Sequence, residues 1–98
     1  MKLMTNELEM KLKKYPLGSQ DGYGDDVIVI CKYFIGNWTW YVTEAEKCLN
    51  GDYEFFGFVV GLYHEWGYFM LSDLESINVN GLRVERDLNF KPTRIGEL

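Results

Sequence analysis

The sequence predicts a single small α+β domain over residues 1–98, with a mainly antiparallel sheet of about four to five strands, an N-terminal helix and a short second helix. At 98 residues the chain is long enough for one hydrophobic core. Its composition, 47% hydrophobic and 16% aromatic with two prolines, is typical of a folded domain and not of a disordered tail. A helical pattern at the start gives way to strand-like runs that turn residues separate.

The first element is expected to be a helix. Thr5 or Asn6 can cap it, and Asn6 and Glu9 have the spacing of a capping box. Pro16 and Gly18 end it. The apolar residues that recur at helical intervals are Met4, Leu8, Leu12 and Tyr15.

Two strands are expected next, joined by a tight turn. Residues 27–35, VIVICKYFI, are apolar nearly throughout, which is typical of a strand covered on both faces. Gly36-Asn37 is a two-residue hairpin signal, so residues 38–44, WTWYVTE, should pair with the preceding run. The row on one face of this second strand is expected to comprise Trp38, Trp40, Val42 and then Glu44.

A second pair of strands follows a polar bridge. YEFFGFVVGLY, residues 53–63, reads as a third strand in which Gly57 and Gly61 permit a bulge or close packing. HEWGYFM, residues 64–70, reads as a fourth strand after a turn near Tyr63. The chain should therefore form a meander.

The last third of the chain should hold a short helix and a final strand. Ser72 and Glu75 have capping-box spacing, so LSDLESIN should begin a helix. Asn80-Gly81 turns the chain into a last strand-like run, which Pro92 ends. The helix residues expected to face inward are Leu71, Leu74 and Ile77.

The charge of the chain is acidic and unevenly distributed. The net charge is −5, and residues 43–75 carry seven acidic residues against Lys47 alone. Such a surface repels phosphate backbones, so direct nucleic-acid binding is disfavoured. It suits a basic protein partner, including one whose usual ligand is DNA or RNA; the simpler interpretation is that the charge keeps a small domain soluble.

The sequence points to the cytoplasm. The opening MKLMTNELEMKLKK has no long apolar stretch, and no later run approaches the roughly 18 apolar residues of a membrane span. Cys31 lies in an apolar run and Cys48 in a polar connection, and the pair fits no metal-binding or redox spacing. Two reduced, structural thiols are expected.

One residue of the last strand-like run, GLRVERDLNF, breaks its apolar pattern. With a period of two, Arg86 falls in the same row as four apolar residues, Leu82, Val84, Leu88 and Phe90. A guanidinium in such a row either lies at a sheet edge with its head in water or pairs with a carboxylate. We expect a structural ion pair with Glu44, Glu65 or Glu75; the alternative is an arginine that reads a ligand.

The sequence carries no clear catalytic constellation. His64 is the only histidine, it lies in an expected turn, and no nucleophile motif accompanies it. The acidic loop after the first helix departs from the calcium-binding pattern, so no metal and no cofactor are predicted. The remaining enzyme hypothesis places Glu44, Glu65 and Arg86 in one pocket, where paired carboxylates would act as acid and base.

The aromatic residues offer a better candidate for function. If the third and fourth strands form a hairpin, one of its faces presents several large rings near acidic residues such as Glu65. Tyrosine and tryptophan are enriched at protein interfaces. The candidate binding residues are Trp66, Tyr68, Tyr63 and Tyr53, with the core as the alternative location of these rings.

The order of the motifs resembles a known family. MKLMTNELEMKL, NWTWYVTEAE, FFGFVVG, GYFMLSDLESI and GLRVERDLNF together resemble a family of bacterial, plasmid and phage proteins designated domain of unknown function, number twenty-nine fifty-eight. Similar proteins often have a proline where Phe34 and Ile35 stand, and leucine at the position of Trp66. The residues that match the family pattern are Trp38, Trp40, Glu44, Phe56, Gly57, Gly67, Tyr68, Glu75, Gly81, Leu82, Glu85, Arg86, Asp87 and Phe90.

The resemblance implies a genetic context and no activity. Small acidic proteins of mobile elements and phages often bind host or defence machinery. We therefore expect a non-catalytic protein-binding accessory or inhibitory factor. A homodimer through residues 27–35 is a further possibility, if that strand lies at an edge of the sheet.

Overall fold

The structure, a computed structural model, describes all residues 1–98 and confirms the predicted α+β domain. Its main sheet has five antiparallel strands in the order β5-β4-β3-β2-β8. The predicted meander forms its first four strands along the chain. These five strands are β2 (Cys31–Ile35), β3 (Trp38–Lys47), β4 (Tyr53–Val60), β5 (His64–Met70) and β8 (Glu85–Arg86).

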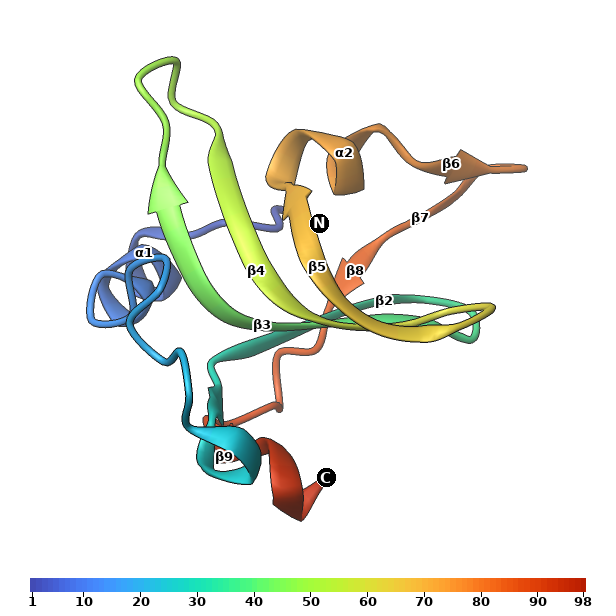
Figure 1. Cartoon of the computed structure of the whole chain (residues 1–98). Helices are drawn as coiled ribbons and strands as arrows, with labels where there is room; N and C mark the ends of the chain where they lie inside the picture. The colour runs from blue at the N-terminus through green and yellow to red at the C-terminus, as the bar shows by residue number, and fades with distance from the viewer.

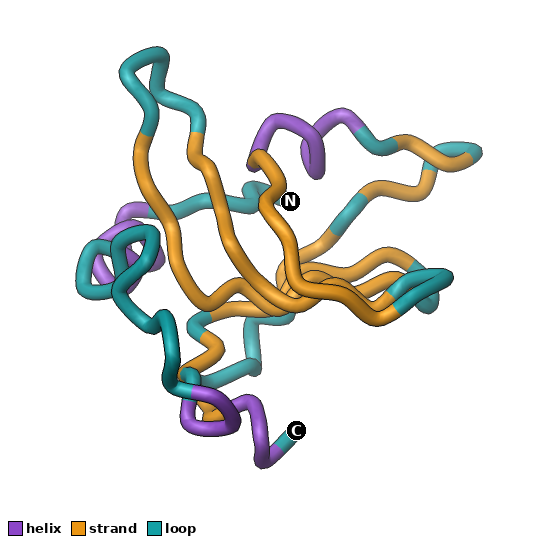
Figure 2. Tube along the Cα trace, in the orientation of Figure 1, coloured by secondary structure: helices purple, strands orange, loops and turns teal.

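Two short two-stranded ribbons and two 3₁₀ turns lie outside the main sheet (Figure 2). The β6–β7 ribbon projects from the body of the domain, and the β1–β9 ribbon places residues 28–29 beside residues 93–94 near the C-terminus. These elements are η1 (Gly24–Asp26), β1 (Ile28–Val29), β6 (Asn78–Val79), β7 (Leu82–Arg83), β9 (Thr93–Arg94) and η2 (Ile95–Glu97).

Both predicted tight turns are present. Ile35 of β2 lies opposite Trp38 of β3, so Gly36-Asn37 is the whole turn between them. Asn80 and Gly81 have φ angles of 53° and 89°, the left-handed conformations that a two-residue hairpin turn requires. The predicted strand over residues 27–35 is interrupted, because β1 pairs with β9 whereas β2 pairs with β3 and β8.

The N-terminal helix, α1 (Asn6–Leu12), begins at the first of the two expected caps. The Thr5 hydroxyl accepts a hydrogen bond from the Leu8 backbone N–H at 3.2 Å, which satisfies one of the free donors at the helix start. Thr5 is therefore the cap, and Asn6 is the first residue of the helix. Leu8 and Leu12 are buried, as the helical spacing predicts.

The second helix, α2 (Leu71–Ser76), begins one residue earlier than its predicted cap. The Asp73 carboxylate accepts a hydrogen bond from the Met70 backbone N–H, while the Ser72 hydroxyl donates to Asp52 at 2.6 Å. The expectation that Ser72 and Glu75 form the capping box is wrong, because Ser72 lies inside the helix and holds the loop before β4.

Both helices pack on one face of the main sheet (Figure 1). We call this the core face and its opposite the outer face. Tyr33 and Phe55 are the largest fully buried side chains of the core face, and the Tyr33 hydroxyl donates to the Leu3 carbonyl at 2.8 Å. The helices contribute Leu8, Leu12, Leu71 and Leu74 to the same core. Neither α-helix covers the outer face.

A bulge in β3 reverses the direction of every side chain beyond it. Val42 lies opposite Gly57, but Glu44 lies opposite Phe56, so Thr43 is an extra residue in the ladder. Two residues on β3 therefore correspond to one step on β4, and Glu44 moves to the outer face. The predicted row that continues from Trp40 and Val42 to Glu44 is wrong for this reason. Figure 1 shows how strongly β3 and β4 bend along their length.

The last strand-like run does not keep one row of side chains. Arg86 lies opposite Tyr33 on the core face, whereas Phe90 packs on the Tyr41 ring of the outer face. Leu82 and Leu88 are exposed. The chain turns after Asp87, whose backbone N–H donates to the Lys32 carbonyl, so the period of two ends there.

Candidate functional site

Four large aromatic side chains form a continuous patch on the outer face of β4 and β5. The register places Phe58 opposite Trp66 and Phe56 opposite Tyr68. Phe56 stacks on Trp66 with ring centroids 5.7 Å apart, and it contacts the Tyr68 ring at 4.8 Å. Trp66 and Tyr68 remain 44% and 66% exposed. We call these four residues the aromatic patch.

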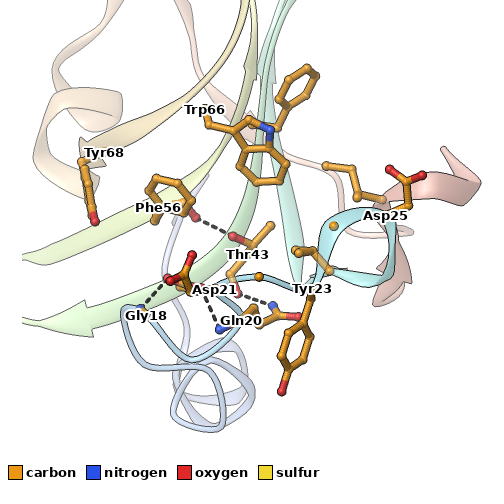
Figure 3. Close-up of a pocket in the computed structure, with 15 residues that line it drawn as sticks. Gly18, Gln20, Asp21, Tyr23, Asp25, Thr43, Phe56, Trp66 and Tyr68 are labelled. Carbon is orange, nitrogen blue, oxygen red and sulfur yellow. Dashed lines mark hydrogen bonds between the residues drawn. The ribbon is translucent and has the colours of Figure 1, made fainter.

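The aromatic patch is one wall of a cleft of about 690 Å³ (Figure 3). The opposite wall is the loop that leads from α1 to β1, together with Ile95. In Figure 3 Phe56, Trp66 and Tyr68 stand on the sheet, while Tyr23 and Asp25 come from the loop, and Tyr23 points away from Trp66. No lysine or arginine lines the cleft.

A buried carboxylate fixes the loop wall to the sheet. The two Glu44 oxygens accept hydrogen bonds from the backbone N–H groups of Gly18 at 2.6 Å and Gln20 at 2.9 Å, the contacts drawn at those residues in Figure 3. The Gln20 side chain is itself buried: its NH₂ group donates to the Ile28 and Thr43 carbonyls, and its oxygen accepts from the Ile28 backbone N–H. Glu44 therefore has a structural role, and its bulge position makes that role possible.

The structure separates the four aromatic residues that the sequence grouped as a binding surface. Trp66 and Tyr68 belong to the aromatic patch. Tyr63 is 78% exposed in the β4–β5 turn and does not line the cleft. Tyr53 is only 6% exposed and stacks on Phe55 in the core. The prediction that Tyr53 belongs to the binding surface is wrong, because position 53 shares the core face with position 55.

Glu65 also lies away from the aromatic patch. It is opposite Val59, hence on the core face, and it lines a second, mainly apolar groove of about 900 Å³ beside the β6–β7 ribbon. One row of opposed residues on the core face runs across all five strands, from Glu65 at one end to Arg86 at the other, through Val59, Trp40 and Tyr33. Four strand spacings of about 4.8 Å therefore separate Glu65 from Arg86.

Arg86 forms no ion pair with any of the three glutamates expected to bind it. Glu44 lies on the opposite face of the sheet, and Glu65 lies at the opposite edge. The Glu75 carbonyl accepts a hydrogen bond from Arg83 instead, at 2.7 Å. The Arg86 Nε atom is buried without a hydrogen-bond partner. The predicted structural ion pair is therefore wrong, and the three proposed pocket residues do not converge.

Burial changes the acidity of two neighbours of Arg86. It raises the pKa of the Cys31 thiol from 9.0 to about 12, although the Arg86 charge opposes the rise. Burial likewise raises the pKa of the Tyr33 hydroxyl above its usual value, with the Cys31 charge adding to the effect. Cys31 and Cys48 are both free cysteines, buried and half-buried respectively.

Three further findings concern metal-binding groups, membrane-spanning helices and the edges of the sheets. No group of three His, Cys, Asp or Glu side chains is placed to hold a metal ion. No helix is both long and apolar enough to cross a membrane. β2 lies between β3 and β8 and is not at an edge of the main sheet, whereas β1 pairs with β9 alone, so a homodimer through residues 27–35 stays a prediction.

Several residues of the cleft were not among the predicted site residues. Phe58 was not assigned to the binding surface, although counting outward from a turn at residues 61–63 places it opposite Trp66. Gln20 and Thr43 carry no signal in the sequence, because their roles depend on the bulge. Asp21 and Asp25 were noted only as part of an acidic loop.

A family model described as "Protein of unknown function (DUF2958)" matches residues 3–95. The chain belongs to this family. The DUF2958 match covers every element that builds the cleft, from the loop after α1 to Ile95. The comparisons with curated proteins and with solved structures found no match.

Proposed function

We propose that this DUF2958 domain is a non-catalytic protein-binding factor, accessory or inhibitory, that places the aromatic patch on a basic protein partner. The observation that carries the proposal is the exposure of Trp66 and Tyr68 on a sheet face that neither α-helix covers. Both α-helices pack on the core face, so the four large rings on the outer face are not needed to bury a helix. An exposed apolar patch of this kind marks an interaction site.

The chemistry of the patch suits an interface. Trp and Tyr are over-represented among the residues that dominate binding energy, because they bury a large area and lose little conformational freedom. Phe56 and Phe58 support the two exposed rings from β4, with contacts of 4.8 to 5.7 Å between centroids. The patch is thus rigid before any partner arrives, which lowers the entropic cost of association.

Charge defines the kind of partner. The net charge of −5 disfavours nucleic acid and favours a basic protein, including one whose usual ligand is DNA or RNA. We further propose a host or defence protein as the target, which is the mobile-element and phage context that the family resemblance implies. Two free cysteines fit a reducing compartment, so we propose that the domain acts in the cytoplasm.

The three residues of the competing enzyme hypothesis, Glu44, Glu65 and Arg86, lie apart from one another. Glu44 is engaged by two backbone N–H groups, and Glu65 and Arg86 lie at opposite edges of the core face. None of the four main cavities contains all three residues. The geometry therefore favours binding over catalysis as the proposed function.

An affinity pull-down from a bacterial lysate tests the proposal. The baits are the wild type, the double variant Trp66→Ala/Tyr68→Ala, and a matched control, Leu62→Ala/Tyr63→Ala, in the exposed β4–β5 turn. All three are first shown to unfold cooperatively in urea. We expect a basic protein that the wild type and the control retain and the patch variant loses, followed by binding with the purified partner. Equal retention by all three baits would exclude the aromatic patch as the interface.

A further inference from the structure

We propose that the cleft beside the aromatic patch binds a cationic side chain of the partner, an arginine in preference to a lysine. This inference rests on the proposed protein-binding function and specifies the chemical group that the site recognises. It follows from three features of the cleft: an aromatic wall, carboxylates without partners, and the absence of any basic residue in the lining.

The aromatic wall offers exposed rings to a cation. The negative face of an aromatic ring attracts a guanidinium or ammonium group within about 6 Å of its centroid, and tryptophan is the strongest ring for this contact. Trp66 and Tyr68 are both exposed, and both contact Phe56 from the next strand. A cation that enters the cleft therefore meets rings that other contacts already orient.

The loop wall supplies negative charge that nothing in the domain neutralises. Asp21 and Asp25 line the cleft, and neither forms an ion pair or a side-chain hydrogen bond. Their neighbour Asp26 differs, because Arg94 lies 3.6 Å from its carboxylate. The domain thus neutralises the acid outside the cleft and leaves two acids that line it without a counter-charge.

A like-charge pair extends the negative surface beyond the cleft. Glu46 and Glu54 lie directly opposite each other on β3 and β4, on the outer face and one step from Phe56. Like charges at opposed positions destabilise a sheet, and neither carboxylate has an ion-pair partner in the domain. A basic segment lying across the patch would remove this repulsion.

The geometry favours arginine over lysine. A guanidinium is planar, stacks on aromatic faces, and forms two parallel hydrogen bonds with a carboxylate. The cleft lining contains both kinds of group, with the rings on β4 and β5 and the carboxylates on the loop. Lysine, a compact and strongly hydrated charge, would keep fewer of these contacts.

A pair of short peptides tests the inference directly. The probes are acetyl-Gly-Arg-Gly-amide and the same peptide with citrulline, which keeps the shape of arginine without its charge. Binding is followed by NMR through the indole N–H signals, which Trp66→Phe assigns. We expect the Trp66 signal to shift and the signal of the buried Trp40 to stay fixed. The arginine peptide should bind about 5- to 30-fold more tightly than the citrulline peptide.

Charge variants locate the contact. Asp21→Asn/Asp25→Asn should weaken binding of the arginine peptide about 3- to 10-fold. Glu75→Gln/Glu85→Gln makes the same change in net charge away from the cleft and should leave binding unchanged within a factor of about two. Equal affinity for arginine and citrulline, or equal losses in the two charge variants, would overturn the inference.

The two proposals fail separately. A protein partner lost on Trp66→Ala/Tyr68→Ala, together with no preference for arginine over citrulline, would keep the binding function and reject the cationic site. An arginine preference without any retained protein would support the cationic site and remove support from the protein-binding function.

Discussion

Gly57 and Gly67 lie directly opposite each other on β4 and β5, yet only Gly57 is in close contact on the side where a Cβ atom would stand. A Cβ at Gly57 would overlap with the Tyr41 carbonyl oxygen, which is backbone at the bulge of β3. A Cβ at Gly67 would meet nothing within 4 Å. Packing against β3 therefore requires glycine at position 57, whereas position 67 has room for a side chain.

We expect Gly57→Ala to lower the free energy of unfolding by about 3 kcal/mol or more, because a backbone oxygen has to move. Gly67→Ala should change it by about 0.5 kcal/mol or less, or raise it slightly, since alanine restricts the unfolded chain. Urea unfolding of both variants measures the difference. Equal losses would contradict the close approach of β4 to the bulge.

Glu44 and Glu46, two residues apart on β3, should respond oppositely to the same substitution. Glu44→Gln places an amide NH₂ group against the backbone N–H of Gly18 or Gln20, which should cost about 1–3 kcal/mol of unfolding free energy. Glu46→Gln removes the repulsion from Glu54 and should be neutral or stabilising by up to about 0.5 kcal/mol.

Amide hydrogen exchange provides the local measurement for this pair. Exchange at Gly18 and Gln20 should accelerate in the Glu44 variant and remain unchanged in the Glu46 variant. A Glu44 variant with normal stability and normal exchange would show that the loop wall of the cleft is held by other contacts.

The order of elements could be predicted from the sequence because each boundary carries a local signal. Gly36-Asn37 and Asn80-Gly81 both form the expected turns, and Thr5 caps the first helix. Turn and cap chemistry depends on a few neighbouring residues, so it is readable in one sequence.

The faces of the sheet could not be predicted, because one inserted residue reverses them. Nothing in WTWYVTE indicates that Thr43 leaves the ladder, and the error placed Glu44 on the wrong face. The ion pair expected between Arg86 and Glu44 is absent for the same reason, because the two residues lie on opposite faces of the sheet. The cleft depends on contacts between Glu44 and residues about 25 positions earlier, which no local pattern encodes.

Tyr53 and Tyr68 provide a direct test of how the structure divides the aromatic residues. Tyr53→Ala should cost about 3–5 kcal/mol of unfolding free energy, because the buried ring leaves a cavity beside Phe55. Tyr68→Ala should cost about 1 kcal/mol or less, since most of its ring is exposed. Urea midpoints measure both effects. A large loss for Tyr68→Ala would mean that the outer face is part of the core.

Cys31 makes the stability of the domain sensitive to alkaline pH. Its pKa is about 12 in the folded protein against 9.0 for an ordinary thiol, so the unfolded chain loses the proton first as pH rises. The stabilisation is complete below pH 9.0 and is lost progressively between pH 9.0 and about 12. Over that range one such group lowers the unfolding free energy by about 1 kcal/mol per pH unit.

The variant Cys31→Ala separates this contribution from that of Tyr33, whose raised pKa acts above its ordinary value of 10.0. The variant should be less stable than the wild type below pH 9.0, and the gap between them should close as the pH approaches 12. Urea unfolding at several pH values measures the gap. A gap independent of pH would mean that the Cys31 thiol ionises as easily in the folded protein as in the unfolded chain, and hence that its side of the sheet is open to water.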